Sequence, residues 1–266
     1  MNPRCIFFFD WDGTLSIGNR PVSDADRSAL KSLQRQGHRL FLCTGRARGY
    51  LLPEALEFGF DGIIAGAGTH IVAGERELLC ETIPPSILRP LVSLFLESGQ
   101  GCILESAAGM VLIHMGNAYA SFHLPVIEKI EDFDALSRQY PINKFSLFGE
   151  RRPGVEEALD AYLTLIPNDG YAEVLPKGCC KSAGMRLVLE DAGLTREDSV
   201  AFGDSTNDTD MLIYAGIGVA MGNAPDEVKA AADFVTGTCE ESGVAGALHN
   251  LGFLPSDEEH EHFINK

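Results

Sequence analysis

Two carboxylates stand directly after an apolar run near the start of the chain. Asp10 and Asp12 follow residues 5–9, Cys-Ile-Phe-Phe-Phe, and precede Gly13 and Thr14. A carboxylate pair at alternate positions can supply a nucleophile and an acid/base, or two ligands for a metal ion. An Asx-type turn at the end of a strand uses the same residue types, so the pair alone leaves both interpretations open.

A second acidic segment, Gly-Asp-Ser-Thr-Asn-Asp at residues 203–208, follows another apolar run. Asp204 and Asp208 lie four residues apart, so a helical turn would point them to one side. A helix N-cap needs only one such residue. The density of oxygen donors, Asn207 included, therefore favours a hard-cation site, for which Mg²⁺ is the natural occupant.

Two further positions carry groups that suit a phosphate. Thr44 offers a hydroxyl and Gly45 a backbone N–H after a third apolar run, although the same pair can simply start a helix. Lys181 offers a cation, although a surface lysine is the commoner role. Lys177 lies near the same point of the chain, so either lysine could serve.

Strands alternate with helices around these polar segments. Such alternation predicts a parallel sheet covered on both faces, with ligands bound beyond the carboxyl ends of its strands. A helix is expected to begin at Ser23, where Asp26 three residues later comes near the capping-box pattern. The other expected elements are strands at 5–9, 39–43, 199–202 and 217–220 and helices at 183–192 and 225–232.

The middle of the chain lacks this regular alternation of strands and helices, which indicates an inserted α+β domain. A Ser-Ala-Ala-Gly turn between two apolar runs indicates an antiparallel hairpin. The expected elements are helices at 87–97 and 155–165 and strands at 102–105, 111–114, 144–148 and 171–175. The predicted organisation is a core at 1–83 and 177–254, an insert at 84–176, and a polar tail at 255–266.

Composition narrows the possible partners. The chain has 21 Lys and Arg residues against 38 Asp and Glu residues, which gives a formal charge of −17. This negative charge argues against a nucleic acid as partner. Any anionic substrate would need a metal ion or a local group of Lys and Arg side chains to bind. Seven cysteines without a CxxC pair indicate reduced thiols. With no signal peptide and no apolar stretch of about 20 residues, we expect a soluble, cytoplasmic protein that does not bind membranes.

The order of the motifs carries a family resemblance. Asp10-Trp11-Asp12-Gly13-Thr14, then Thr44-Gly45-Arg46, then Lys181, then the segment 203–208, resembles the four motifs of the haloacid dehalogenase (HAD) superfamily. The insert is similar to the type 2 cap of the Cof-like phosphatases. The resemblance implies an α/β fold with a Rossmann-like parallel-sheet core and an inserted α+β cap domain.

The resemblance also implies roles for individual residues. Asp10 would be the nucleophile that forms an aspartyl-phosphate, and Asp12 the acid/base. Mg²⁺ would be held by the Asp10 carboxylate, the Asp12 main-chain carbonyl and the Asp204 carboxylate, with Asp208 linked behind them or through water. The residues expected to bind the phosphoryl oxygens are Thr44, Gly45, Lys181, which the family alignment favours over Lys177, and Asn207.

The expected activity is hydrolysis of small phosphomonoesters, sugar phosphates first, by a monomer or homodimer. A phosphomutase could use the same aspartate pair, and a non-catalytic sensor could bind the same phosphorylated metabolites. A dinucleotide-binding oxidoreductase is disfavoured because the last position of the glycine fingerprint falls on Ile71.

Substrate-selecting residues are harder to assign. Many Cof-like proteins carry an Asn-Gly pair where this chain has Gly-Ala-Gly-Thr at 66–69. Polar candidates in the insert are Glu105, His114, His123 and Lys144, and for each of them an ordinary surface or turn role is expected. Asn223 matches the family and is expected to position a nearby loop or to reach the site.

Overall fold

The computed structural model describes residues 4–18, 20–117, 119, 122–150, 152, 154–159, 162–168 and 170–254. Contacts divide the chain into two compact units. The first comprises Met1–Thr44, Glu54–Ile63 and Met185–Lys266, and the second Gly45–Pro53 and Ile64–Gly184. The expected polar tail, 255–266, lies outside the described residues. The domain limits drawn from the sequence remain a prediction.

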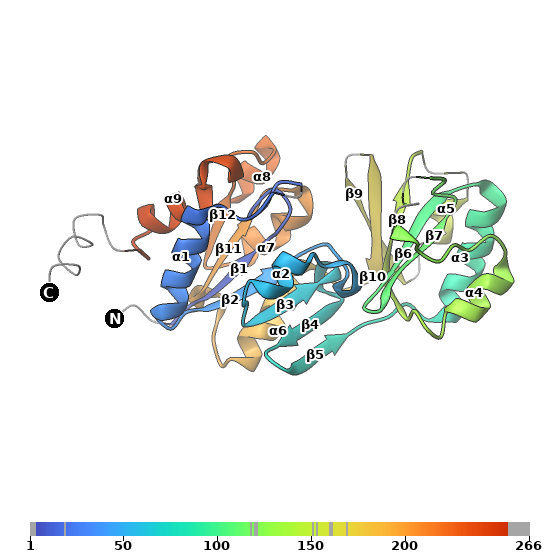
Figure 1. Ribbon diagram of the computed structural model, residues 1–266, viewed down its shortest axis with the longest axis horizontal. Helices are drawn as coiled ribbons and strands as arrows, with labels where there is room; N and C mark the ends of the chain where they lie inside the picture. Colours follow the sequence, from blue (N-terminus) through green and yellow to red (C-terminus); the bar gives the residue numbers. More distant parts are fainter. Residues whose placement is uncertain are drawn as a thin grey trace, which may run out of the picture. The chain divides into compact units, whose positions relative to one another are not determined.

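An eight-stranded sheet carries the motifs, in the order β13-β12-β11-β1-β2-β3-β4-β5 (Figure 1). Neighbours from β13 to β2 pair in parallel, whereas β4 and β5 are antiparallel. The strands are β1 Ile6–Phe9, β2 Arg39–Cys43, β3 Gly62–Ala65, β4 His70–Ala73, β5 Arg76–Cys80, β11 Ser199–Gly203, β12 Ile217–Ala220 and β13 Phe234–Val235.

The central strand β1 shows why the apolar run at 5–9 forms a buried parallel strand. All four of its residues are fully buried, and β1 pairs with β11 on one side and β2 on the other, with Phe9 opposite both Phe202 and Leu42. A strand covered on both faces can be continuously apolar. The parallel register brings the carboxyl ends of β1, β2 and β11 to the same edge.

Helices and short 3₁₀ turns connect these strands. The α-helices are α1 Asp24–Arg35, α2 Pro53–Glu57, α6 Lys181–Asp191, α7 Thr209–Tyr214, α8 Asp226–Ala231 and α9 Gly243–Asn250. The 3₁₀ turns are η1 Arg48–Tyr50, η2 Gly66–Gly68, η4 Arg196–Asp198, η5 Thr206–Asp208 and η6 Cys239–Glu241. Among the described residues, no helix is both long enough and apolar enough to cross a membrane.

The start of α1 confirms the predicted helix start at Ser23. The Asp26 N–H donates to Ser23 Oγ at 3.0 Å, and Ser23 Oγ donates to Asp26 Oδ2 at 2.9 Å. Asp26 is fully buried, and its other oxygen accepts from Ala245 N at 2.8 Å. The cap therefore also joins α1 to α9, which lie beside each other in Figure 1.

The second unit contains a five-stranded antiparallel sheet in the order β7-β6-β8-β10-β9. One core cluster joins this sheet to the helices, and within it the Phe95 and Phe145 rings lie 5.7 Å apart. The elements are β6 Gly101–Ser106, β7 Gly109–Ile113, β8 Ile142–Phe148, β9 Leu163–Asn168, β10 Tyr171–Pro176, α3 Pro85–Ser98, α4 Ile130–Leu136 and α5 Val155–Ala158. The α/β class with an α+β insert is thereby confirmed.

One predicted element is wrong. The helix expected at 155–165 is limited to α5, Val155–Ala158, and Leu163–Asn168 forms β9 instead. The sequence after Asn168 is Asp-Gly, a dipeptide typical of two-residue hairpin turns. β9 pairs with β10 in antiparallel register, from Tyr171 opposite Asn168 onward. As the edge strand it tolerates Pro167, whose missing N–H would break a central strand.

His38 makes the stability of the first unit depend on pH. Its ring is buried, 5% exposed, against Phe7 and Phe253, and Nδ1 accepts from Cys5 N at 3.1 Å. Burial lowers the pKa of His38 below its ordinary value. The unfolded chain, with a histidine pKa of about 6.5, therefore binds the proton more readily than the folded one.

We expect the free energy of unfolding to be greatest above pH 6.5 or so and to fall as the pH drops through that value. In His38→Asn, whose Oδ1 can still accept from Cys5 N, this part of the fall should disappear. Urea unfolding at pH 8 and 5.5 measures it, with the exposed His249→Asn as control. Equal losses of stability in wild type and His38→Asn would contradict the assignment.

Candidate active site

Three carboxylates gather at the carboxyl edge of the parallel sheet. Asp10 follows β1, Asp204 follows β11, and Asp208 ends the 3₁₀ turn after that strand. Asp10 N donates to Phe202 O at 2.9 Å, which continues the β1–β11 ladder into the site. One oxygen from each of the three aspartates lies within 4.8 Å of the other two. Asp10 is 5% exposed and Asp208 fully buried, so the negative charges are concentrated where water screens them poorly.

Hydrogen bonds hold the Asp204 carboxylate in place. Oδ1 accepts from Thr14 Oγ1 at 3.2 Å, and Oδ2 accepts from Asn223 Nδ2 at 3.2 Å. The same Asn223 amide donates to Gly13 O at 2.9 Å. Asn223 thus joins the loops after β1, β11 and β12, which is the positioning role expected for it.

Gly13 is required by this arrangement. Its φ of +89° lies in the left-handed region, and a Cβ there would stand 2.1 Å from Asp204 Oδ2. Any larger residue would therefore displace the carboxylate. The Asp-Gly-Thr sequence places an acid, a required glycine and a hydroxyl donor to Asp204 in successive positions.

Asp208 belongs to the carboxylate cluster and also fixes the loop after β11 through hydrogen bonds. Its Oδ2 accepts from Asp204 N at 3.0 Å, Ser205 N at 2.9 Å and Ser205 Oγ at 3.2 Å. The capping interpretation of this segment is therefore confirmed, and Asp208 also belongs to the carboxylate cluster, whereas binding of a cation there stays a prediction. Asn207 lies beside it, half-buried, with its Oδ1 accepting from Ser205 Oγ at 2.8 Å.

The remaining predicted residues fall in both units. Asp12 is exposed, and its side chain is not one of the three in the carboxylate cluster. Thr44 is buried at the end of β2 in the first unit. Gly45 and Lys181 belong to the second unit, where Lys181 is the first residue of α6 and is 1% exposed.

The donor set fits a hard divalent cation. Three carboxylates with no nitrogen or sulfur ligand among them match the preference of Mg²⁺ for oxygen. A cluster of three negative charges, of which Asp10 and Asp208 are buried and Asp204 is half-buried, also needs positive charge to offset its repulsion.

Comparison with known proteins decides the family. The model of the haloacid dehalogenase-like hydrolases matches residues 7–248, nearly the whole chain. The chain belongs to this family. It is thus an enzyme of the hydrolase class, and the resemblance drawn from its motifs is confirmed.

Individual relatives of this HAD-like hydrolase match nine-tenths or more of its length. YkrA of Bacillus subtilis strain 168 is 30% identical over 261 residues, covering 94% of this chain and 98% of the relative. The HMP-PP phosphatase of Cronobacter sakazakii is 30% identical over 266 residues, covering 90% and 93%. The solved structure of the HAD subclass IIB sugar phosphatase BT4131 matches with a TM-score of 0.82 at 26% identity, covering 94% of this chain and 100% of that one.

In the insert of this HAD-like hydrolase, the sequence-based expectation for two residues is wrong. Glu105 and Lys144 are buried rather than on the surface or in turns, because β6 and β8 place them opposite each other in the middle of the five-stranded sheet. Lys144 Nζ pairs with Glu173, lies 3.7 Å from Glu105, and donates to Gly45 O at 2.8 Å. Ser146 Oγ donates to Glu105 Oε1 at 2.7 Å.

These four side chains, Glu105, Lys144, Ser146 and Glu173, form what we call the buried charge cluster. Burial by itself lowers the pKa of Lys144, but the carboxylates of Glu105 and Glu173 raise it above its ordinary value. Lys144 is therefore a buried cation whose Nζ also donates a hydrogen bond to the backbone carbonyl of Gly45. His114 and His123, by contrast, are exposed and have positive φ, as residues in turns do.

Proposed function

We propose that this HAD-like hydrolase is a Mg²⁺-dependent phosphatase of small phosphomonoesters that works through an aspartyl-phosphate. The observation that carries the proposal is the position of Asp10, a carboxylate at the end of a buried central strand, within 4.8 Å of two further carboxylates. An acidic cluster of this kind needs a cation before it can accept a phosphate dianion.

Asp10 is the proposed nucleophile. One of its oxygens attacks phosphorus, and the bond from phosphorus to the leaving oxygen breaks while Asp12 gives that oxygen a proton. Water then attacks the aspartyl-phosphate, Asp12 takes a proton from it, and Asp10 and inorganic phosphate are released. The surroundings of the two carboxylates suit these two roles, because the proposed nucleophile Asp10 is buried whereas the proposed acid/base Asp12 is exposed.

The other proposed roles follow the chemistry of each group. Mg²⁺, when bound by the Asp10 and Asp204 carboxylates and the Asp12 carbonyl, offsets negative charge on the phosphoryl oxygens. Asp208 keeps Asp204 and its loop in place through the hydrogen bonds described above. Thr44, Gly45, Lys181 and Asn207 are proposed to bind the phosphoryl oxygens.

Sugar phosphates are the proposed substrates, supported by the likeness to the sugar phosphatase BT4131 over nearly the whole chain. We propose that the insert at 84–176 is the cap that selects the leaving group. No disulfide joins the seven cysteines, all of which lie among the described residues, and this fits the proposed cytoplasmic location.

The test is phosphate release from p-nitrophenyl phosphate and a panel of sugar phosphates, nucleotides and other monoesters. We expect release with Mg²⁺, loss of turnover in excess EDTA, and recovery when Mg²⁺ exceeds the chelator. Within the panel, sugar phosphates should give the highest kcat/KM. Activity that persists in excess EDTA would contradict the proposal.

A further inference from the structure

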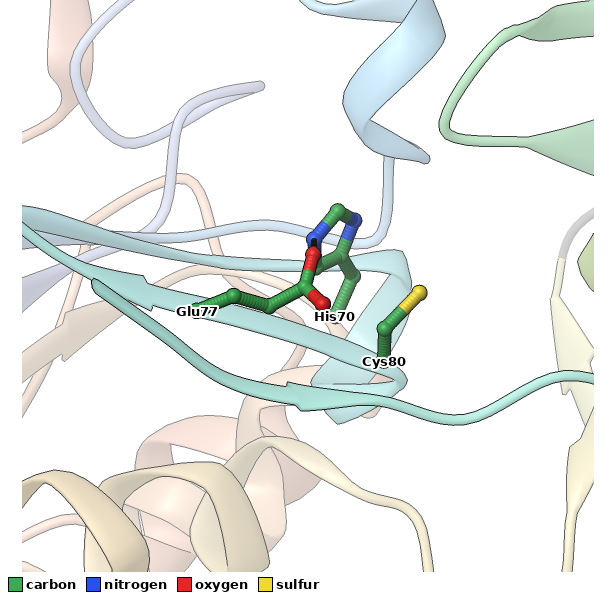
Figure 2. A group of neighbouring side chains, drawn as sticks. All are labelled: His70, Glu77 and Cys80. Carbon is green, nitrogen blue, oxygen red and sulfur yellow. Dashed lines mark hydrogen bonds and ion pairs between the residues drawn. The ribbon is translucent and has the colours of Figure 1, made fainter. Parts of the chain in front are cut away.

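A second group of metal-binding side chains lies on the β4–β5 hairpin, away from the HAD motifs in the sequence. It consists of His70, Glu77 and Cys80, and one ligand atom from each lies within 4.8 Å of the other two (Figure 2). The three are nitrogen, oxygen and sulfur donors, unlike the all-carboxylate set around Asp10. Such a mixture suits Zn²⁺ and similar transition metals rather than Mg²⁺.

An irregularity in the hairpin brings the three side chains to one face. His70 and Cys80 are directly opposite each other, so they share a face. Glu77 and Cys80 are three residues apart and would face opposite sides of a regular strand. The register shifts after Ile71, placing Glu77 opposite Val72, which is on the His70 face.

His70 provides the observation that points to a ligand. Its side chain is 4% exposed, and Nε2 lies 2.9 Å from Glu77 Oε2. Because a carboxylate only accepts, Nε2 carries the hydrogen and Nδ1 is left with a lone pair. That buried Nδ1 has no hydrogen-bond partner among the described residues. Figure 2 shows it on the Cys80 side of the ring.

The surroundings of Cys80 suit a metal-bound thiolate. Cys80 is exposed, so an ion and its water ligands can reach the sulfur. Asn143 Nδ2 donates to Cys80 Sγ at 3.6 Å, and the same amide group is fixed by donation to Glu81 O at 2.7 Å. Amide donors to a ligating sulfur and carboxylate partners to a ligating imidazole are the usual outer contacts of metal sites.

We propose that the hairpin binds one Zn²⁺-like ion through His70 Nδ1 and Cys80 Sγ, with Glu77 fixing the imidazole and water completing the coordination. Typical bond lengths place a nitrogen and a sulfur that bind the same ion about 3.5 Å apart. The site needs neither Asp10 nor Mg²⁺, so it stands independently of the phosphatase proposal.

Co²⁺ is the probe, because a cobalt–thiolate bond has a charge-transfer absorption that carboxylate sites lack. Metal-free protein with saturating Mg²⁺ is titrated with Co²⁺, and Zn²⁺ is then added in competition. We expect a thiolate band that saturates at about one equivalent, is removed by Zn²⁺, and is lost in Cys80→Ser. Glu77→Ala should weaken binding about 10- to 100-fold.

Two control variants define the outcome. Cys179→Ser should keep the band, since burial, Glu81 and Cys180 raise the pKa of that thiol to about 11 and make it a poor ligand. Asp204→Asn should also keep it, because it alters only the carboxylate cluster. A wild-type protein without a thiolate band, or a band that survives in Cys80→Ser, would overturn the proposal. Because Cys80 is exposed, its serine variant is expected to fold.

Discussion

Replacing Asp10 by asparagine is expected to lower kcat for phosphate release by about 10⁴-fold or more. Asparagine has nearly the same shape but no nucleophilic oxygen anion, so the aspartyl-phosphate cannot form. It also removes one of the three carboxylates at the sheet edge. The measurement is phosphate release with saturating Mg²⁺, compared with Asp24→Asn, which changes an exposed aspartate in the first turn of α1.

The stability of the same variant separates lost chemistry from lost folding. Without metal, the carboxylates of Asp10, Asp204 and Asp208 repel one another, so Asp10→Asn should unfold in EDTA at a temperature no lower than wild type. Its stabilisation by added Mg²⁺ should be smaller, because a cation ligand has been removed. A variant that keeps more than roughly one hundredth of the wild-type kcat would show that Asp10 is not the nucleophile.

The sheet edge could be predicted from sequence because its determinants are local. A continuous apolar strand followed by polar residues defines both β1 and its loop, and the same pattern recurs at β11. The acidic cluster follows from two facts, that parallel strands end at one edge and that each of these two ends in aspartates.

The contacts that could not be predicted join segments that lie far apart in the sequence. Residues 45–53 fall in the same contact unit as the strands of the five-stranded sheet. Gly49 packs so closely on Gly109 that a Cβ at position 49 would stand 2.3 Å from the Gly109 nitrogen. Neither glycine signals this contact by itself, because glycine is equally common in open turns.

The hairpin at β9 and β10 illustrates a different failure. Residues 155–165 contain enough apolar positions to predict a helix. The Asp-Gly dipeptide after Asn168 was the available signal, since it marks a tight turn between two strands. At Leu163–Asn168 the local sequence agrees with the pairing to β10, since Thr164 and Ile166 are β-branched and Pro167 would break a helix.

The buried charge cluster was missed for a related reason. Glu105, Lys144 and Glu173 lie on three different strands, and a lone Glu or Lys is most often on the surface. Only the order β6-β8-β10 places Glu105 opposite Lys144 and Glu173 opposite Ser146, all on one face of the sheet. The cluster thus depends on long-range pairing that no single segment encodes.

Replacing Lys144 by methionine is expected to destabilise the second unit by about 3–5 kcal/mol. Methionine fills much of the same volume but leaves Glu105 and Glu173 buried at 6% and 4% exposure without their cation. It also removes the hydrogen bond from Nζ to Gly45 O. Urea unfolding followed by circular dichroism measures the loss, with Lys31→Met on the exposed side of α1 as control.

A triple variant tests whether uncompensated charge is the cause. Adding Glu105→Gln and Glu173→Gln to Lys144→Met removes the two buried negative charges that lack a cation. Most of the lost stability should therefore return, although three charged groups have been replaced. Glu173→Gln alone should cost less than Lys144→Met, because Lys144 would keep Glu105 as its partner. If Lys144→Met costs less than about 1 kcal/mol, or if the triple variant is less stable than Lys144→Met, the lysine is not the counter-charge that holds these strands together.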